Sequence, residues 1–527
     1  MTIGQWFLRT VTTIERETPK SGAFVIGTFA DDYAINSIRS KRFTLGARRM
    51  HMATASATND REPFIDGEWQ GSDAVIDVTD LADGGVFARV SVADREQAES
   101  ALAAAEDTQS ALAETTVPER VAWLEAIAAE LRERKTELAD IIVREAGKPI
   151  ASARGEVESA AERFERAVGE ARDLTGEYRQ GTTAGHEGWR AITTPEPIGT
   201  VLCITPYNYP LSTTALQVAP ALAAGNSVVL KPASKTPVSA AILTEIISAT
   251  DIPEGGFNFV PGHASEIGDV LSGSSAVNAI AMTGSSAAGE HVARESGIVN
   301  LHMELGGNAP AVVLPDADLD ATAGDCAKGA LKYAGQRCSA VSRVLAHEEI
   351  HDDLVDAIDD AMDEWHAGDL FDEETALGPL ISTEQADWVE ELIEDAREKG
   401  AHLVRGGERD GQFVEPTLLA DVPRDARIVR EEQFGPVIPV TKIESEDDAV
   451  SVANASDLAL DAAVFTADHD RAMDVAERID AGAVRINGAP SHGLGDIPFG
   501  GNKRSGINRE GIGVSIEQFV RRKSIVL

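Results

Sequence analysis

The sequence predicts an α/β protein with two doubly wound domains and a small β element. The chain has 527 residues and a hydrophobic content of 43%, which is more than one simple hydrophobic core holds. Short β-rich runs alternate with helical stretches, as expected of parallel βαβ units in a doubly wound sheet. This alternation occurs twice, and the second series occupies roughly 304–480.

The first series begins with helices and continues with strands. The first long helical pattern starts near Pro118, a residue suited to a first helical turn, and apolar residues recur at helical spacing from Leu124 to Ile142. A second helix follows Pro149. The strands expected next, each ending in a Pro- or Gly-containing turn, are 200–205, 227–230, 257–260 and 277–282.

The second series contains strands at 343–346, 437–443 and 462–465 and a helix from Ile350. The C-terminal run 519–527 resembles an isolated strand with no later segment to pair with. We therefore expect it to complete a sheet in a neighbouring subunit of a homodimer or homotetramer. The predicted organisation is an extension at 1–51, a first domain at 52–180 and 197–303, a second domain at 304–495, and a β element at 181–196 and 505–527.

The charge balance is strongly acidic, with 87 acidic and 47 basic residues and a net charge of −40. Such a surface repels nucleic acid and anionic membranes, so neither is an expected partner. Only 12 of the basic residues are Lys, and this acid-rich, Lys-poor composition resembles proteins of extreme halophiles. No apolar run approaches the roughly 20 residues of a membrane span. The 3 Cys are too few for a disulfide framework, which favours a reducing, cytoplasmic location.

The first 51 residues differ from the rest, because they hold 8 basic and 4 acidic residues. Their net charge of +4 contrasts with −44 for the remainder. A targeting segment is one interpretation, but the run has no compact apolar region and no clear cleavage site. We favour Met52 as the natural start, with 1–51 a misassigned or disordered extension.

Cys338 is the candidate nucleophile, because it lies in a polar, turn-like setting at 335–339. A nucleophilic Cys must reach the thiolate form with help from a cation, a base or a helix dipole. Cys203 lies in an apolar strand and Cys326 in an Ala-rich helix, both normal for inert thiols. By itself a lone Cys is more often structural than catalytic.

Seven motifs around Cys338 change that assessment. They occur in a fixed order, and with them residues 63–527 resemble the aldehyde dehydrogenase superfamily. The motifs are TPYNYP at 205–210, KPAS at 231–234, TGS at 283–285, MELGGN at 303–308, GQRC at 335–338, EQFGP at 432–436 and PFGG at 498–501.

The resemblance implies an enzyme that oxidises an aldehyde to the acid with NAD(P). Cys338 would form a thiohemiacetal and then a thioester, which Glu304 would hydrolyse as general base. The amide of Asn208 and the backbone N–H of Cys338 would stabilise the oxyanion. The presence of Glu304 argues against the branch that forms acyl-CoA. The alternative is an inactive binding or structural protein on the same fold, which the intact site disfavours.

The resemblance also implies a Rossmann-like cofactor domain followed by a catalytic domain. Gly284 and Gly289 do not form the common dinucleotide fingerprint, so the motif alone is a weak signal. Ser234 and Lys235 occupy positions where a small hydroxyl and a cation accept a 2′-phosphate, so we expect NADP to be used. The implied cofactor-binding residues are Thr205, Pro206, Tyr207, Lys231, Ala233, Ser234, Lys235, Gly284, Ser285, Leu305, Glu432 and Phe434.

Tyr209 and Arg337 resemble residues that non-phosphorylating glyceraldehyde-3-phosphate dehydrogenases place around an anionic substrate. The chain departs from that subgroup, because His492 stands where a further Arg is usual and no Arg occurs at 157–161. The candidate substrates are therefore glyceraldehyde 3-phosphate, lactaldehyde, succinate semialdehyde and 2-oxoglutarate semialdehyde. A structural ion pair is an equally good interpretation of Arg337.

The run from His347 to His351 matches the zinc-protease pattern HExxH, which needs both His on one helical face. We expect His347 at a strand end and His351 on the following helix, so we assign no metal. The remaining histidines are scattered singly, and the sequence gives them no special role.

Overall fold

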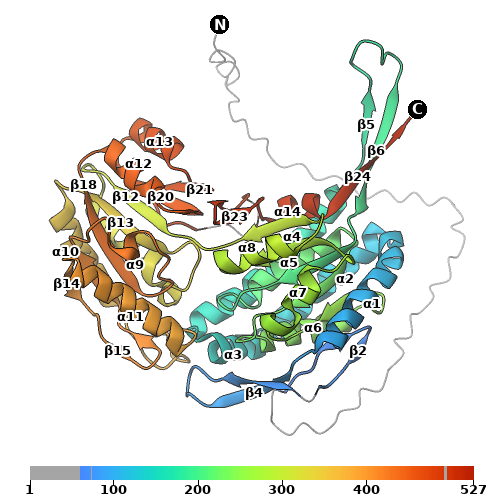
Figure 1. The fold of residues 1–527 in the computed structure, drawn as a ribbon, viewed down its shortest axis with the longest axis horizontal. Coiled ribbons are helices and arrows are strands. Elements are labelled where there is room, and N and C mark those ends of the chain that lie inside the picture. Colours follow the sequence, from blue (N-terminus) through green and yellow to red (C-terminus); the bar gives the residue numbers. More distant parts are fainter. Residues whose placement is uncertain (1–59, 73, 492–494, 496) are drawn as a thin grey trace, which may run out of the picture. The chain divides into compact units, whose positions relative to one another are not determined.

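The computed structural model describes residues 60–72, 74–491, 495 and 497–527, and Figure 1 shows its fold. The predicted extension 1–51 and the candidate substrate residue His492 lie outside the described residues. In the part of the chain that is described, no helix is both long and apolar enough to cross a bilayer.

The first domain is built on an eight-stranded sheet in the order β2-β1-β9-β8-β7-β10-β11-β23. Among the parallel strands, the chain passes from β7 to β8 and β9 on one side, and then returns to the other side of β7 for β10 and β11. The strand order therefore reverses between β7 and β10. The parallel strands are β7 (Thr200–Ile204), β8 (Ser227–Lys231), β9 (Phe257–Phe259), β10 (Val277–Thr283) and β11 (Asn300–Glu304). Antiparallel edges are β1 (Phe64–Ile65), β2 (Glu68–Trp69) and β23 (Gly506–Ile507).

Helices cover both faces of this sheet (Figure 1). α2 starts with Thr116 as N-cap and Pro118 in its first turn, and α4 follows Pro149, as predicted. The prediction that the first helical pattern starts near Pro118 was wrong, because α1 precedes it. The helices are α1 (Arg95–Glu114), α2 (Val117–Glu133), α3 (Lys135–Ala146), α4 (Ile150–Asp173), α5 (Ser212–Ala223), α6 (Val238–Ser248), α7 (Ala264–Ser272), α8 (Ser286–Glu295) and α14 (Ile512–Gln518).

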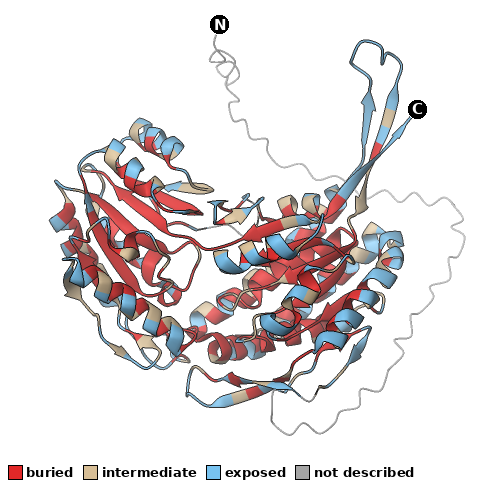
Figure 2. Ribbon diagram, in the orientation of Figure 1, coloured by how far each residue is buried: buried red, intermediate tan, exposed pale blue. Residues whose placement is uncertain are grey.

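The second domain contains a seven-stranded sheet in the order β14-β17-β18-β13-β12-β20-β21, in which only the β14–β17 pair is antiparallel. Figure 2 shows its strands buried beneath helices whose outer faces are exposed. The strands are β12 (Ala309–Val313), β13 (Val341–His347), β14 (His402–Arg405), β17 (Thr417–Ala420), β18 (Val437–Ile443), β20 (Asp461–Phe465) and β21 (Ala483–Ile486). The helices are α9 (Leu319–Leu331), α10 (His351–Ala361), α11 (Thr383–Glu398), α12 (Glu446–Asn454) and α13 (His469–Arg478).

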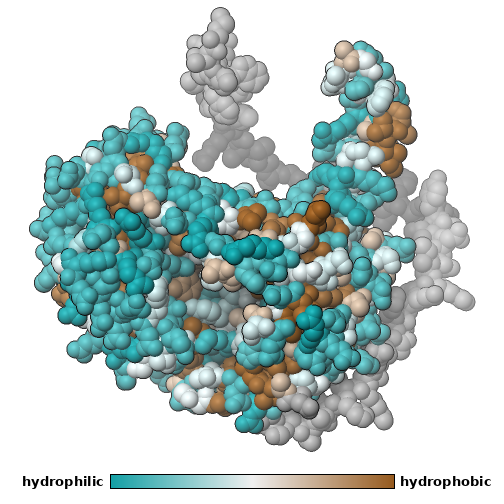
Figure 3. Space-filling model, viewed as in Figure 1, coloured by the Kyte–Doolittle hydropathy of each residue, from teal (hydrophilic) through white to brown (hydrophobic). Residues whose placement is uncertain are grey.

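The C-terminal strand does not stand alone, which corrects the sequence prediction. β24 (Val520–Val526) pairs antiparallel with β6 (Arg190–Pro197), which pairs in turn with β5 (Glu177–Gln180). The β element thus begins at Glu177 rather than 181, and β23 belongs to the eight-stranded sheet. Exposed apolar side chains gather on this projecting sheet (Figure 3), namely Tyr178, Trp189, Ile192, Ile525, Val526 and Leu527. A homo-oligomer contact through them stays a prediction.

The remaining strands form three short antiparallel pairs. They are β3 (Val75–Thr79) with β4 (Val86–Ser91), β15 (Arg409–Asp410) with β16 (Phe413–Val414), and β19 (Leu458–Ala459) with β22 (Asn502–Lys503).

Candidate active site

A cavity of about 950 Å³ lies at the position in the first sheet where the strand order reverses. Its walls include the β7–α5 loop at 205–211 and the β10–α8 turn at 284–285, which follow the two strands on either side of the reversal. Ligands of open α/β sheets bind at this position, beyond the carboxyl ends of the strands. The second domain contributes the loop at 332–339 together with Glu432 and Phe434.

A strained turn delivers Cys338 to the cavity. Tyr333, Ala334 and Gly335 follow α9 with φ angles of 56°, 50° and 71°, in the left-handed region that non-glycine residues avoid. A side chain at Gly335 would place its Cβ 2.1 Å from the carbonyl oxygen of Gly435. Tyr333 Oη donates to the carbonyl of Ala146 at 2.6 Å and fixes the turn against the first domain.

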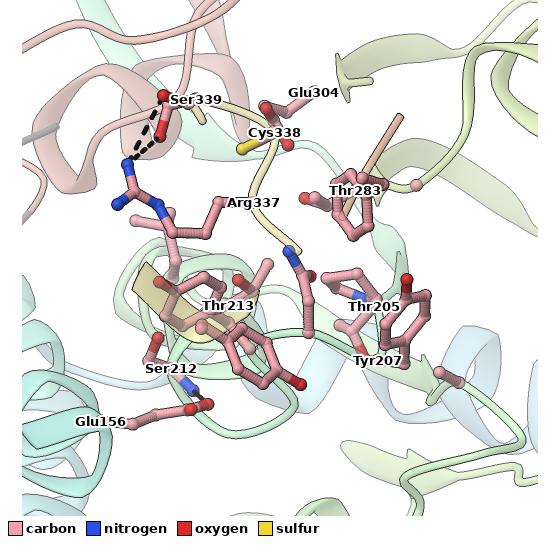
Figure 4. Close-up of a pocket in the computed structure, with 18 of the residues that line it drawn as sticks. Glu156, Thr205, Tyr207, Ser212, Thr213, Thr283, Glu304, Arg337, Cys338 and Ser339 are labelled. Atoms are coloured by element: carbon pink, nitrogen blue, oxygen red, sulfur yellow. Dashed lines mark hydrogen bonds between the residues drawn. The ribbon is translucent and has the colours of Figure 1, made fainter. Parts of the chain in front are cut away.

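The Cys338 thiol lies beside the Glu304 carboxyl group, as Figure 4 shows. Glu304 ends β11, is buried, and has an Oε1 without a hydrogen-bond partner among the described residues. Burial and the negative charge of Glu510 raise the Glu304 pKa well above its usual value. Burial and Glu304 raise the Cys338 pKa in the same way, so the free thiol is protonated and Glu304 is the nearest base.

Asn208 connects the first domain to the loop that carries Cys338. Its buried Nδ2 donates to the carbonyl oxygen of Gln336 at 2.8 Å and carries a second hydrogen. The Gln336 side chain is held in turn, because its Oε1 accepts from the backbone N–H of Ile381 at 2.9 Å. The side-chain amide of Asn208 is therefore held at the carbonyl group of Gln336, two residues before Cys338.

A buried ion pair of Lys148 with Glu156 lies under Tyr209. The Lys148 ammonium is 3.6 Å from the centre of the Tyr209 ring, which is a cation–π distance. Glu156 Oε1 also accepts from the backbone N–H groups of Leu211 and Ser212 at 3.1 and 3.2 Å. Lys148 and Glu156 thus position Tyr209, a function that the sequence did not suggest.

Two arginines line the cavity without a carboxylate within 4 Å in the described part of the chain. Arg337 is buried and donates to Ser339 Oγ at 3.2 Å and to the carbonyl of Pro490 at 3.3 Å. Arg163 on α4 donates to the carbonyl of Ser212, and its buried Nε has no partner among the described residues. The described residues therefore contain no ion-pair partner for Arg337, so they do not support the interpretation of Arg337 as a structural ion pair. The sequence analysis did not identify Arg163 as a site residue.

The residues expected to bind adenosine lie after β8. Lys231 is buried, and its ammonium group has the carbonyl of Pro232 as a neutral acceptor at 3.2 Å, so it keeps hydrogens for ribose hydroxyls. Burial lowers its pKa to about 8. Ser234 Oγ donates to the carbonyl of Gly262 at 2.9 Å, and the exposed Lys235 ammonium is 3.9 Å from Glu384. Of these four residues, Ala233 lines the cavity, and Lys231, Ser234 and Lys235 lie outside its lining.

The residues expected near the pyrophosphate and the nicotinamide line the same cavity, and their chemistry fits a dinucleotide. Ser285 caps α8 beside Gly284, which leaves backbone N–H groups at a helix start, where a pyrophosphate binds. Glu432 Oε1 accepts from the backbone N–H of Gly307 at 2.9 Å. The rings of Tyr207 and Phe434 meet edge-on at 6.0 Å. Three further expected residues, Thr205, Pro206 and Leu305, also line the cavity.

The HExxH match is divided between two elements, as predicted. His347 is the last residue of β13 and His351 the first of α10. The His351 ring is buried, and its Nδ1 lies 2.7 Å from Asp352 Oδ1. The two rings therefore do not share a helical face.

Residues 69–525 match the aldehyde dehydrogenase family. A 3-sulfolactaldehyde dehydrogenase of Priestia aryabhattai is 36% identical over 466 residues, which cover 88% of this chain and 97% of the relative. A lactaldehyde dehydrogenase of Methanococcus maripaludis is 35% identical over 468 residues, covering 88% and 99%. The NADP-dependent glyceraldehyde-3-phosphate dehydrogenase of Bacillus halodurans, solved with NADP, is similar with a TM-score of 0.87 and 35% identity, covering 89% of this chain and 99% of that one.

The chain therefore belongs to the aldehyde dehydrogenase family, as the seven motifs predicted. It is an oxidoreductase that acts on aldehydes and uses NADP or NAD. Its α/β fold is confirmed by the same structural similarity.

Proposed function

We propose that this enzyme oxidises a small anionic aldehyde to its carboxylic acid through a thioester on Cys338. The observation that carries the proposal is the convergence of the Cys338 thiol, the Glu304 carboxyl group and the Asn208 amide in one cavity. We infer further that the eight-stranded domain binds the cofactor and the seven-stranded domain supplies the nucleophile.

Acylation begins with proton transfer from Cys338 to Glu304, which is beside it. The sulfur then forms a bond to the aldehyde carbon, and the oxygen becomes an oxyanion. Asn208 Nδ2, fixed by Gln336, and the backbone N–H of Cys338 donate to that oxygen. The bound nicotinamide supplies a hydride acceptor, and the product left on the enzyme is a thioester.

Hydrolysis of the thioester requires a base that accepts a proton from water, and Glu304, which lies beside Cys338, has this role. After the proton that it took from Cys338 has left to solvent, its carboxylate takes a proton from water while the water oxygen bonds to the thioester carbon. The carbon–sulfur bond breaks, the acid leaves, and the Cys338 thiolate takes the proton back from Glu304, which restores the thiol and the carboxylate. Because the Glu304 pKa is raised, the group is a stronger base than an exposed Glu.

The preference for an anionic aldehyde rests on the two arginines. In a protein with net charge −40, the cavity nevertheless presents Arg163 and Arg337 without carboxylate partners among the described residues. Arg163 lies on the same face of α4 as Ser159, and both residues line the cavity. Arg163 therefore supplies a guanidinium group to the cavity from a position just after 157–161, the range in which no Arg occurs. Glyceraldehyde 3-phosphate, lactaldehyde and the semialdehydes are the candidates, and the anionic members fit the arginines better.

Replacing Arg337 with Gln is expected to raise KM for an anionic aldehyde by about 10- to 100-fold, because a hydrogen bond to a charged group contributes about 1.5–3 kcal/mol. For neutral lactaldehyde, KM should change little. Arg163→Gln should act in the same direction, and Arg166→Gln, an exposed residue of α4, is the control. Steady-state kinetics with glyceraldehyde 3-phosphate, succinate semialdehyde and lactaldehyde provide the measurement. Equal losses with all three would assign Arg337 to the scaffold.

Replacing Ser234 with Glu is expected to lower kcat/KM for NADP at least about tenfold while sparing NAD, because a carboxylate repels the 2′-phosphate. Lys235→Ala should weaken NADP use in the same direction, and its exposed side chain makes misfolding improbable as a cause. Initial rates with each cofactor measure the change. A proportional loss with NADP and NAD would show that the 2′-phosphate does not lie at this position.

A further inference from the structure

Helix α11 holds the segment 425–434, which precedes β18 and contains both Glu432 and Phe434. Helix and segment run in opposite directions, because side chains on one face of the helix contact the segment in reverse order. From the end of the helix to its start, the contacts are Lys399 to the carbonyl of Asp425, Asp395 to the N–H of Arg427, Trp388 to the carbonyl of Glu432, and Gln385 to the carbonyls of Gln433 and Phe434. The segment therefore takes its position from this face of α11.

Trp388 is the residue that brings this contact to the edge of the cavity. It is half-buried, it lines the cavity, and its indole N–H donates to the carbonyl of Glu432 at 3.0 Å. The Arg427 guanidinium lies 5.0 Å from the centre of its ring, a cation–π distance. Arg427 is itself held by ion pairs with Glu391 on α11 and with Glu431. The indole is therefore fixed with its N–H directed at Glu432.

Glu432 is held through its main chain and through its side chain. Trp388 binds its carbonyl, and its Oε1 accepts from the backbone N–H of Gly307 at 2.9 Å. Two residues later, Phe434 has a φ angle of 49°, in the left-handed region. Such backbone persists only where the surrounding contacts hold it, so the loss of one contact should let the segment relax.

We propose that Trp388 is a positioning residue for the cofactor, because its N–H fixes the main chain from which the Glu432 carboxylate reaches toward the nicotinamide ribose. The inference rests on the expected role of Glu432 in cofactor binding. Trp388 acts through Glu432 and not on the reacting atoms. Without the hydrogen bond, the nicotinamide half of the cofactor is held less firmly. The adenosine half, with Lys231 and Ser234 as its expected contacts, is unaffected.

Replacing Trp388 with Phe in the full-length enzyme keeps an aromatic ring for Arg427 and removes the N–H. The rate of hydride transfer, followed as reduced cofactor in a single turnover, should fall by about 3- to 10-fold, the scale of one hydrogen bond. KM for NADP should change little, since the adenosine half keeps its contacts. The aldehyde is the one that the wild type oxidises fastest among those named above.

Bound NADPH gives a second measurement that needs no aldehyde. The fluorescence anisotropy of its nicotinamide ring should be lower on Trp388→Phe than on the wild type, because the ring moves more freely. Adenosine 2′,5′-bisphosphate, which has no nicotinamide half, should bind both proteins equally. Equal binding also shows that the variant is folded.

Two further variants separate the hydrogen bond from the packing of the ring. Trp388→Gln supplies an amide N–H without the ring and should recover most of the rate and of the anisotropy. Trp365→Phe is the matched control, because it changes a half-buried Trp of the second domain that is not among the described residues lining the cavity. It should behave as the wild type.

The outcomes distinguish the positioning role from the proposed function. Wild-type rate and anisotropy in Trp388→Phe, or equal losses in Trp388→Phe and Trp388→Gln, would overturn the positioning role. Wild-type anisotropy in Glu432→Ala would overturn it too, by removing its basis. If the wild type oxidises none of the aldehydes but the anisotropy changes as expected, the proposed function fails and the positioning role stands.

Discussion

Replacing Cys338 with Ala is expected to reduce aldehyde oxidation by more than about 10⁴-fold, the scale seen when a covalent enzyme loses its nucleophile. No other described Cys faces the cavity, since Cys203 and Cys326 are both buried in the cores. Without the sulfur, neither the thiohemiacetal nor the thioester forms. The measurement is the initial rate of cofactor reduction at saturating aldehyde and NADP.

Cys326→Ala is the matched control, because it removes a thiol from α9, shortly before the same turn. It should keep wild-type kcat and lose about 1 kcal/mol of stability, a typical cost of a core substitution. NADP binding to Cys338→Ala, measured by fluorescence or calorimetry, should remain. If that variant binds NADP and still oxidises aldehydes at more than a tenth of the wild-type rate, Cys338 is not the nucleophile.

The central strands could be predicted because they are short, continuous apolar runs ended by turn residues. The run 437–443 is β18 without change, and 200–205 differs from β7 by one residue. A strand buried on both faces has such a run, so its existence and its limits are visible locally. The motifs that identify the site also lie at strand ends, where this fold places chemistry.

What escaped prediction depends on contacts that sequence spacing does not encode. α1 buries Ala98, Ala101 and Ala105, whose small side chains give only a faint apolar pattern. The partner of β24 is β6, more than 300 residues earlier in the chain, so the strand looked isolated. Arg163 and Glu510 belong to no motif on which the analysis relied, and only folding brings them to the cavity.

Replacing Glu304 with Gln is expected to separate the two halves of the reaction. Asn208 and Cys338 remain, so one equivalent of reduced cofactor per active site should form in a burst, which is slower than in the wild type because Cys338 has lost the group that takes its proton. Turnover after the burst should fall by about 10²- to 10⁴-fold, the usual contribution of a general base. Rapid mixing gives the burst, and mass spectrometry gives the thioester on Cys338.

The pH dependence should distinguish a base from a merely structural carboxylate. A base acts when deprotonated, and burial with the charge of Glu510 raises the Glu304 pKa. Thioester hydrolysis by the wild type should therefore fall as pH drops below that raised pKa and rise through it as pH increases. In Glu304→Gln this limb should vanish, leaving slow hydrolysis that follows hydroxide alone. A variant that turns over at the wild-type rate with the same limb would mean that another group activates the water. Glu510, the cavity carboxyl group whose charge raises the Glu304 pKa most, would then be the one to replace.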